Sequence, residues 1–366
     1  MKIAYVLDDT LDKSDGVQQA VITIAEHVRK LGHDVHYIVP QTTRTDLKNI
    51  HCISRFVQLK FNGNSVRTPL PAPRSQVKAL LKREQFDVLH VQMPYSPLLA
   101  GRVIRAAHKN TRVVGTFHIL PYNTFAKVGT RLLGIWLSRN LRRFDTTYAV
   151  SEPAQQFMQA SFGIRPDVLG NPIQYEFFHR YAHDVLKKPP MKNIIYVGRF
   201  DKRKGVLQLL MAYRQMENQA TCSLIMCGKG PLLEDAKRYA EQHKLNVTFP
   251  GFVSEEEKAS YLSNATLAVF PSISGESFGI VLTEAMASGA QITLGGNNPG
   301  YASVLGAWPE VLFDPNNTEE FAKKLNSFLS DHSKRILVGK AQSEFVKSFD
   351  VQYVCKTLLE EAYLKK

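Results

Sequence analysis

The sequence predicts an α/β protein of two doubly wound, Rossmann-like domains with a deep interdomain cleft. Its 366 residues exceed what one hydrophobic core usually serves. Strand-like apolar runs alternate with segments of helical spacing throughout, which is typical of parallel sheets covered on both faces. One charged, poorly periodic stretch ending in Pro189-Pro190 interrupts this alternation. Two such sheets side by side leave a cleft at the carboxyl ends of their strands.

The interruption sets the expected boundaries: a first domain over 1–173, a linker over 174–190, a second domain over 191–346 and a last helical segment within 347–366. In the first domain, apolar runs predict the strands Lys2–Leu7, Val35–Val39, Val88–Gln92, Val113–Phe117 and Thr147–Val150. Helical spacing predicts Gly16–Leu31, which Gly32 ends, then Arg74–Arg83 and a long amphipathic segment over Lys127–Arg143.

In the second domain the same criteria predict strands over Asn193–Val197, Cys222–Cys227, Val247–Phe249, Leu267–Phe270, Gln291–Leu294 and Val311–Phe313. The predicted helices are Gly205–Met216, Pro231–His243, Glu255–Ser263, Phe278–Ala287, 318–329 and 332–346. A final helix over Val351–Leu364 has no strand after it.

Composition narrows the class of protein. The net charge of +13 favours an anionic partner, whether nucleic acid, a phosphorylated small molecule or an anionic membrane. Four scattered cysteines without metal-ligand spacing are interpreted as reduced core residues of a cytosolic protein. The short apolar run Ile3 to Leu7 is expected to be a strand and not a signal peptide. No apolar stretch is long enough to span a membrane.

Residues 274–289 are the strongest candidate site. They place Glu276 on a turn and Glu284 inside the helix that follows it, after the buried strand Leu267–Phe270. The helix start presents free backbone N–H groups, which suit an anion or a hydroxyl-rich ligand. These are the groups of Ser277, Phe278, Gly279 and Ile280.

A basic turn follows the strand Asn193–Val197. Gly198 allows a ligand to approach the backbone, while Arg199 and Lys204 offer cations for phosphate oxygens. The alternative is a solvated basic turn. Two further glycine turns, Cys227–Pro231 and Gly251-Phe252-Val253, suit the base of a nucleotide, or are simple loop punctuation.

The first domain offers two more candidates. Gly16 opens the first helix, where bare N–H groups suit a diphosphate, although it is equally an ordinary helix entry. His118 follows the strand Val113–Phe117 and is expected to point into the cleft, unless it is a structural histidine.

The segment Gly275-Glu276-Ser277-Phe278-Gly279 with Glu284 resembles the Glu-x7-Glu motif of retaining GT-B glycosyltransferases. Supporting segments are Gly16-Val17, Thr116-Phe117-His118, Val150-Ser151-Glu152-Pro153 and Gly198-Arg199 with Lys204-Gly205. The closest resemblance is to bacterial phosphatidylinositol mannosyltransferases, and it runs from Lys2 to about Leu359. It implies the GT-B fold, with the final helix crossing back to the first domain.

The resemblance also implies residue roles. Arg199 and Lys204 would neutralise the diphosphate of a nucleotide-sugar donor, Glu276 and the following amides would bind sugar hydroxyls, and Glu284 would bind the ribose. Gly251 to Val253 would receive the base. From the first domain, Gly16 would face the diphosphate and His118 the transferred sugar.

A lipid surface is the expected place of the acceptor. Arg74, Lys78, Lys82 and Arg83 form a basic amphipathic helix suited to an anionic membrane, and Leu132–Phe144 is a second candidate. Either segment is alternatively a surface helix packed on the sheet.

Acceptor specificity is expected to depend on Asp9, Asn62 and Asn123. Asp8-Asp9 replaces an aromatic residue of the mannosyltransferases, and Asn123 lies near their lysine, which disfavours a phosphorylated inositol headgroup. An uncharged lipid or glycolipid is therefore an alternative acceptor.

The expected activity is a retaining, metal-independent hexosyl transfer, with GDP-mannose the favoured donor and a lipid or glycolipid, including a phosphatidylinositol-type lipid, the acceptor. It needs no cofactor and no nucleic acid, and is expected at the inner face of the plasma membrane. The alternatives are a UDP-sugar-dependent transferase acting on another glycan or diacylglycerol, an epimerase or phosphorylase, and a non-catalytic nucleotide- or nucleic-acid-binding protein. An oxidoreductase is disfavoured because no Gly-x-Gly-x-x-Gly follows the first strand.

Overall fold

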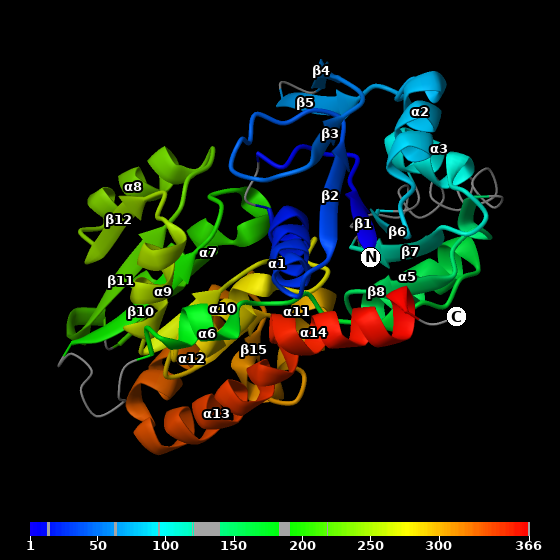
Figure 1. Ribbon diagram of the computed structural model, residues 1–366. Helices are drawn as coiled ribbons and strands as arrows, with labels where there is room; N and C mark the ends of the chain where they lie inside the picture. Colours follow the sequence, from blue (N-terminus) through cyan, green and yellow to red (C-terminus); the bar gives the residue numbers. More distant parts are fainter. Residues whose placement is uncertain are drawn as a thin grey trace. The chain divides into compact units, whose positions relative to one another are not determined.

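The computed structural model describes residues 1–12, 15–61, 64–93, 96–118, 120, 140–182, 191–217 and 219–364. The chain forms two units, Met1–Pro172 with Val351–Lys366, and Ile173–Asp350. Each unit holds one parallel sheet covered by helices (Figure 1), which confirms the predicted fold class.

The first unit is built on a seven-stranded parallel sheet of order β3-β2-β1-β6-β7-β8-β9. Its strands are β1 (Lys2–Val6), β2 (Asp34–Val39), β3 (Ile50–Cys52), β6 (Val88–Gln92), β7 (Arg112–Phe117), β8 (Thr146–Ala149) and β9 (Asp167–Val168). The helices are α1 (Gly16–Lys30), α2 (Arg74–Glu84), α3 (Leu99–Ala106), α5 (Glu152–Phe162) and α14 (Val351–Thr357), which a π-helical turn, η6 (Leu358–Tyr363), extends.

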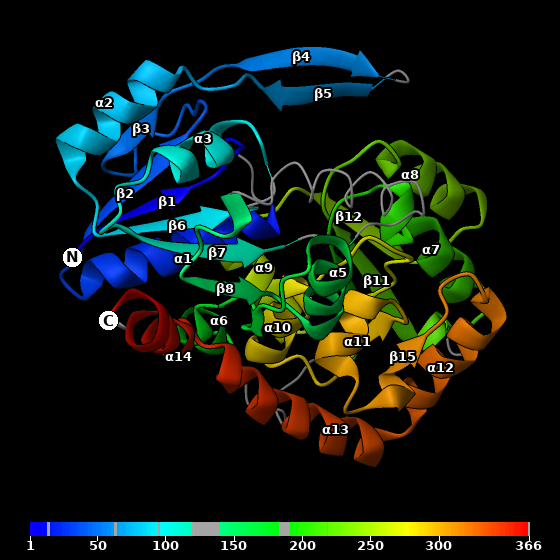
Figure 2. The same cartoon turned by 90° about the vertical axis from the view of Figure 1, so that its right-hand side faces the viewer.

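Alternation along β1 divides the core of this unit into two layers. Ile3, Tyr5 and Leu7 pack with α1 and α14, whereas Ala4 and Val6 pack with α2 and α3. Helices α2 and α3 lie side by side (Figures 1 and 2). A separate antiparallel hairpin of β4 (Phe56–Phe61) and β5 (Asn64–Pro69) was not predicted.

The second unit is built on a six-stranded parallel sheet of order β12-β11-β10-β13-β14-β15. Its strands are β10 (Lys192–Val197), β11 (Cys222–Cys227), β12 (Val247–Gly251), β13 (Leu267–Phe270), β14 (Thr293–Gly296) and β15 (Leu312–Phe313). The α-helices are α6 (Tyr175–His179), α7 (Val206–Arg214), α8 (Leu233–Gln242), α9 (Glu255–Ser263), α10 (Ile280–Ala287), α11 (Pro299–Leu305), α12 (Thr318–Ser330) and α13 (His332–Phe345). The 3₁₀ turns are η2 (Lys202–Lys204), η3 (Gln219–Thr221), η4 (Pro309–Val311) and η5 (Val346–Phe349).

Other details also differ from the sequence-based expectations. The segment expected as a linker contains the helix α6, because Tyr175 and Phe178 are buried in the second unit. Helix α10 begins at Ile280 and not at Phe278, since Gly279 takes a left-handed conformation with φ 110°. Cys52 is exposed and not a core residue, because it ends the edge strand β3.

Candidate functional site

Glu276 lies on the loop after β13 and meets the basic loop after β10. Lys204 Nζ donates to Glu276 Oε1 at 2.7 Å, and Ser272 Oγ donates to the same oxygen at 3.0 Å. Burial lowers the pKa of Lys204, but the Glu276 carboxylate, with a smaller contribution from Tyr196, raises it above its ordinary value, so the ammonium stays charged. Among the described residues, the side-chain hydrogen bonds of Glu276 all fall on Oε1, which leaves Oε2 to accept from a ligand.

Tyr301 contacts Ser272, the residue that donates to Glu276. Its hydroxyl lies 3.1 Å from Ser272 Oγ, and its side chain is 1% exposed. Asn298 caps α11 and donates to the backbone oxygen of Ser272 at 2.9 Å. Gly300 allows close packing, because a Cβ there would lie 2.2 Å from the Glu276 backbone oxygen. The loop that holds Glu276 is therefore fixed by β14 and α11.

The basic loop is held by its own aspartate. Asp201 accepts from the N–H groups of Arg203 at 3.0 Å and Lys204 at 3.2 Å, which caps η2. A Cβ on Gly205 would lie 2.0 Å from the Pro271 oxygen, so only glycine lets the two loops approach this closely. Arg199 points outward, with a side chain 66% exposed and Nε 3.8 Å from Asp201. Lys204 is thus held against Glu276 while Arg199 is available to an anion.

The glycines after β10 and β11 have a packing role. A Cβ on Gly228 would lie 1.8 Å from the Gly198 oxygen, and one on Gly230 would lie 2.3 Å from the Phe200 oxygen. A Cβ on Gly198 would meet the Tyr196 hydroxyl at 2.7 Å. Both turns therefore need glycine to pack together, whatever they bind.

The start of α10 faces the same edge of the sheet as the loop of Glu276. Gly279 precedes the helix, and its missing Cβ leaves room for the Tyr301 ring, which would otherwise lie 2.6 Å away. Ser277 and Ile280 are half-buried and Phe278 is buried. The first N–H groups of a helix have no intrahelical acceptor, so this helix start is suited to hydroxyl or phosphate oxygens.

Glu284 forms an ion pair with Lys258 of α9. Lys258 Nζ lies 2.7 Å from Glu284 Oε1 and 2.8 Å from Glu255 Oε2. Lys258 is 7% exposed and Glu284 5% exposed, and the ammonium lies 5.4 Å from the centre of the Phe178 ring. Burial lowers the pKa of Lys258, but the two carboxylates raise it by more.

The turn after β12 presents an exposed aromatic ring. Gly251 has φ 83°, and Phe252 beside it is 61% exposed. Lys229, from the turn after β11, lies 5.3 Å from the centre of the Phe252 ring. Val253 is half-buried. A flat ring at the edge of the sheet offers a stacking surface.

In the first unit, Gly16 is the first residue of α1, and His118 follows β7. His118 is 5% exposed, and its Nε2 lies 2.6 Å from Gln92 Oε1. Burial lowers the pKa of His118 to about 4, so the ring is neutral at pH 7. With Gln92 accepting from Nε2, the buried Nδ1 has no partner among the described residues and is left as an acceptor.

The acidic pair after β1 has divided roles. Asp8 is 7% exposed and accepts from the N–H groups of Leu99 at 2.8 Å and Ala100 at 3.2 Å, so it caps α3. Asp8 therefore has a structural role at the start of α3, whereas the role of Asp9 in acceptor specificity stays a prediction. Asp9 is half-buried and accepts from the Thr10 N–H at 2.8 Å. Asn62 and Asn123 lie outside the described residues.

The basic helix predicted from the sequence is α2. Arg74, Lys78, Lys82 and Arg83 are all exposed on it. The second membrane candidate, Leu132–Phe144, lies mostly outside the described ranges, as does the amphipathic segment Lys127–Arg143. Of the helices that the structure describes, none has the length and apolar character needed to cross a bilayer.

Ser272, Tyr301 and Lys258 are the site residues that sequence reasoning missed. Ser272 lies two residues after the end of β13, and this position was its only signal. Tyr301 and Lys258 had none, because Tyr301 contacts a residue 29 positions away and Lys258 contacts one 26 positions away.

Two glycosyltransferase family models match this chain, one in each half of the sequence. Residues 14–177 match the Glycosyltransferase Family 4 model, and residues 180–344 match the Glycosyl transferases group 1 model. A phosphatidyl-myo-inositol mannosyltransferase of Mycobacterium leprae is 28% identical over 98% of this chain and 96% of that protein. Its counterpart in Mycobacterium tuberculosis is 29% identical over 86% of this chain and 80% of that protein.

Solved structures share the fold. A glycosyltransferase of Rickettsia africae has a TM-score of 0.76 at 18% identity, covering 100% of this chain and 99% of that one. Anabaena HepE in complex with UDP has a TM-score of 0.78 at 18% identity, covering 98% of this chain and 99% of that one. The chain therefore belongs to the GT-B glycosyltransferases that combine a Glycosyltransferase Family 4 domain with a Glycosyl transferases group 1 domain.

Proposed function

We propose that the protein is a retaining, metal-independent hexosyltransferase that moves mannose from GDP-mannose to a lipid or glycolipid acceptor at the inner face of the plasma membrane. The observation that carries this is the contact of Lys204 with Glu276 on one carboxylate oxygen. It fixes the side chain and leaves its other oxygen for a sugar hydroxyl. The mannosyltransferases similar over most of the chain support the choice of donor and a phosphatidylinositol-type acceptor.

The charges favour departure of a diphosphate. As the bond from the anomeric carbon to the phosphate oxygen breaks, negative charge grows on the leaving group. Arg199, Lys204 and the N–H groups at the start of α10 are suited to that charge. An acceptor hydroxyl attacking from the same face would give its proton to the leaving phosphate and retain the anomeric configuration.

The remaining donor contacts are assigned as follows. Glu284, oriented by Lys258, accepts from the ribose hydroxyls, and the base lies against Gly251 to Val253 beside the Phe252 ring. Gly16 faces the diphosphate, and the neutral His118 accepts from a hydroxyl of the transferred sugar through Nδ1. The exposed cations of α2 attract the anionic membrane surface.

A donor screen tests this proposal. GDP- and UDP-sugars are compared by hydrolysis and thermal shift, with and without phosphatidylinositol-containing vesicles. GDP-mannose turnover that increases with the lipid is expected. A preference for a UDP-sugar would redirect the donor assignment, and donor consumption without an acceptor would indicate an epimerase. RNA or DNA binding that falls steeply with salt, without turnover, would indicate a nucleic-acid-binding protein.

A further inference from the structure

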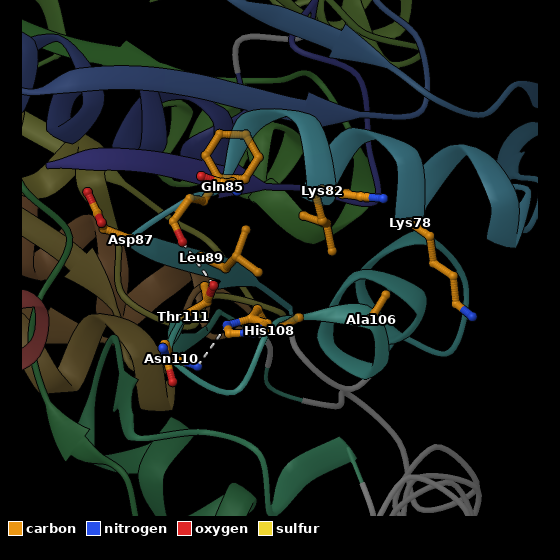
Figure 3. A pocket seen from close by; sticks show the side chains of 12 residues that line it. Lys78, Lys82, Gln85, Asp87, Leu89, Ala106, His108, Asn110 and Thr111 are labelled. Carbon is orange, nitrogen blue, oxygen red and sulfur yellow. Dashed lines mark hydrogen bonds between the residues drawn. The ribbon is translucent and has the colours of Figure 1, made fainter.

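A pocket of about 480 Å³ opens in the first unit between α2 and the turn that joins α3 to β7 (Figure 3). Asp87 and Thr111, which directly precede β6 and β7, contribute to its wall. The pocket is thus at the amino ends of these strands, whereas His118 follows the carboxyl end of β7. It therefore lies at the opposite end of these strands from His118.

The interior of the pocket is mainly apolar. Its apolar lining comes from Leu81, Phe86, Leu89, Ala106 and Ala107. Two of the polar lining groups already have partners: the Thr111 hydroxyl donates to the Phe86 oxygen at 2.9 Å, and Asp87 accepts from the Lys2 N–H at 2.7 Å. The other polar lining residues apart from the lysines, Gln85, His108 and Asn110, are exposed to solvent. A polar ligand would therefore find little to bind inside, whereas a hydrocarbon chain would bury apolar surface.

The α2 side of the pocket is cationic. Lys78 and Lys82 line it and are exposed, and Arg74 continues the row at the same four-residue spacing. The structure gives these three side chains no ion pair within the described residues. The only acidic residue of α2, Glu84, forms ion pairs with Lys2 at 3.0 Å and with Arg83 at 2.8 Å.

Helix stability does not explain this row. Like charges four residues apart each cost a helix roughly 0.2–0.5 kcal/mol, and Arg74 stands in the first turn, where the helix dipole disfavours a cation. On the neighbouring helix, Arg102 and Arg105 add to the positive surface. An uncompensated cationic surface beside an apolar pocket matches a ligand that is anionic at one end and apolar at the other.

We propose that this pocket takes one acyl chain of an anionic membrane phospholipid, with the lipid phosphate held by Lys78 and Lys82. A small hydrophilic anion would use the two lysines but leave the apolar walls wet. A neutral hydrocarbon would fill the pocket but gain nothing from the lysines. The inference rests on the proposed reaction at a membrane surface, and it adds a lipid-binding site separate from the acceptor site.

Binding of a monomeric short-chain lipid tests the proposal. Dihexanoyl phosphatidylglycerol below its critical micelle concentration is titrated by calorimetry into the full chain, with glycerol 3-phosphate as the headgroup alone. Saturable binding of the lipid is expected, with no detectable binding of glycerol 3-phosphate. Equal affinity for both would overturn the proposal and indicate a simple anion site.

Two variants separate the pocket from its charges. Ala106→Leu fills the space in which the Ala106 methyl group lies (Figure 3), and it is expected to weaken lipid binding at least tenfold while keeping every charge. The double variant Lys78→Ser/Lys82→Ser is expected to weaken it similarly. The matched control is Lys237→Ser/Lys340→Ser, which removes the same charge from exposed lysines of the second unit and is expected to have no effect.

Two results would contradict the acyl-chain site. Unchanged binding by a folded Ala106→Leu protein would show adsorption to the surface without entry of the chain. Equal loss in the control variant would show that only net charge matters. Thermal unfolding verifies that each variant is folded, and Ala106→Met replaces the leucine variant if that one is unfolded. Because no donor or turnover is involved, failure here leaves the proposed transferase activity to its own test.

Discussion

Replacing Lys258 with methionine tests how much the buried ion pair of Lys258 with Glu284 contributes to stability. The substitution keeps an apolar stem of similar length but removes the ammonium that lies 2.7 Å from Glu284. Glu284 is 5% exposed, so its carboxylate would be left buried without its cation. Removing one member of a buried pair typically costs about 3–5 kcal/mol, because the remaining charge is uncompensated.

The loss should depend on pH in a defined direction. Burial raises the pKa of Glu284 and Lys258 lowers it, with burial the larger effect. In Lys258→Met the opposing effect is gone, so the pKa of Glu284 rises further above the unfolded value of about 4.3. The folded state then binds the extra proton, and its stability falls as pH rises from that value through the raised pKa. The destabilisation should therefore be larger at pH 8 than at pH 5.

Thermal and urea unfolding at both pH values measure this. For a unit of this size, each kcal/mol lowers the melting temperature by roughly 2–4 °C. Adding Glu284→Gln to Lys258→Met should recover most of the loss, because neither charge remains. A Lys258→Met protein as stable as the wild type at pH 8 would refute the reasoning. So would a double variant no more stable than the single one.

Three further predictions concern other parts of the molecule. Tyr301→Phe removes the hydroxyl that lies 3.1 Å from Ser272 Oγ. The variant should raise the KM for the donor several-fold, while its binding of a nucleoside diphosphate, measured by calorimetry, stays unchanged. Equal loss of donor and nucleoside diphosphate binding would instead indicate a general packing defect. Gly279 and Gly32 both have a positive φ, 110° and 88°, but a Cβ on Gly279 would lie 2.6 Å from the Tyr301 ring, whereas one on Gly32 would meet open space. Gly279→Ala should therefore lose more stability in urea than Gly32→Ala. Equal losses would exclude a clash with the Tyr301 ring. Burial lowers the pKa of His90 to about 3 and of His118 to about 4, so the unfolded chain binds more protons than the folded one. The first unit should therefore lose stability as pH falls from about 6.5 toward 4, by roughly 1.4 kcal/mol per pKa unit for each ring. A urea midpoint that does not change across that range would contradict the burial of both rings as neutral groups.

Buried parallel strands were the part of the fold that the sequence predicted best. Val88–Gln92 and Cys222–Cys227 have the same bounds in the sequence and in the structure, because strands covered on both faces are continuous apolar runs. Helix α5 was missed although Ser151 caps it and Pro153 stands in its first turn, which is a recognisable start signal. The hairpin of β4 and β5 lies outside the parallel sheets and gave no comparable pattern.

The site was predictable only where its residues share a sheet edge. Glu276 and Lys204 follow the carboxyl ends of neighbouring parallel strands, so topology alone brings their loops together. The pairing of Lys258 with Glu284 joins α9 to α10 and depends on packing between helices. Gly228 illustrates the reverse case, since its need for glycine comes from the Gly198 oxygen, a contact that no local motif encodes.

The rate of sugar transfer by Glu276→Gln and Lys204→Ala, compared with the wild type on GDP-mannose and phosphatidylinositol-containing vesicles, tests the central claim most directly. If the two side chains hold the donor and stabilise its leaving group, each variant should lose transfer by roughly 10²–10³-fold. Glu276→Gln should still bind GDP, because the diphosphate cations remain. Full transfer activity in both variants would contradict the account.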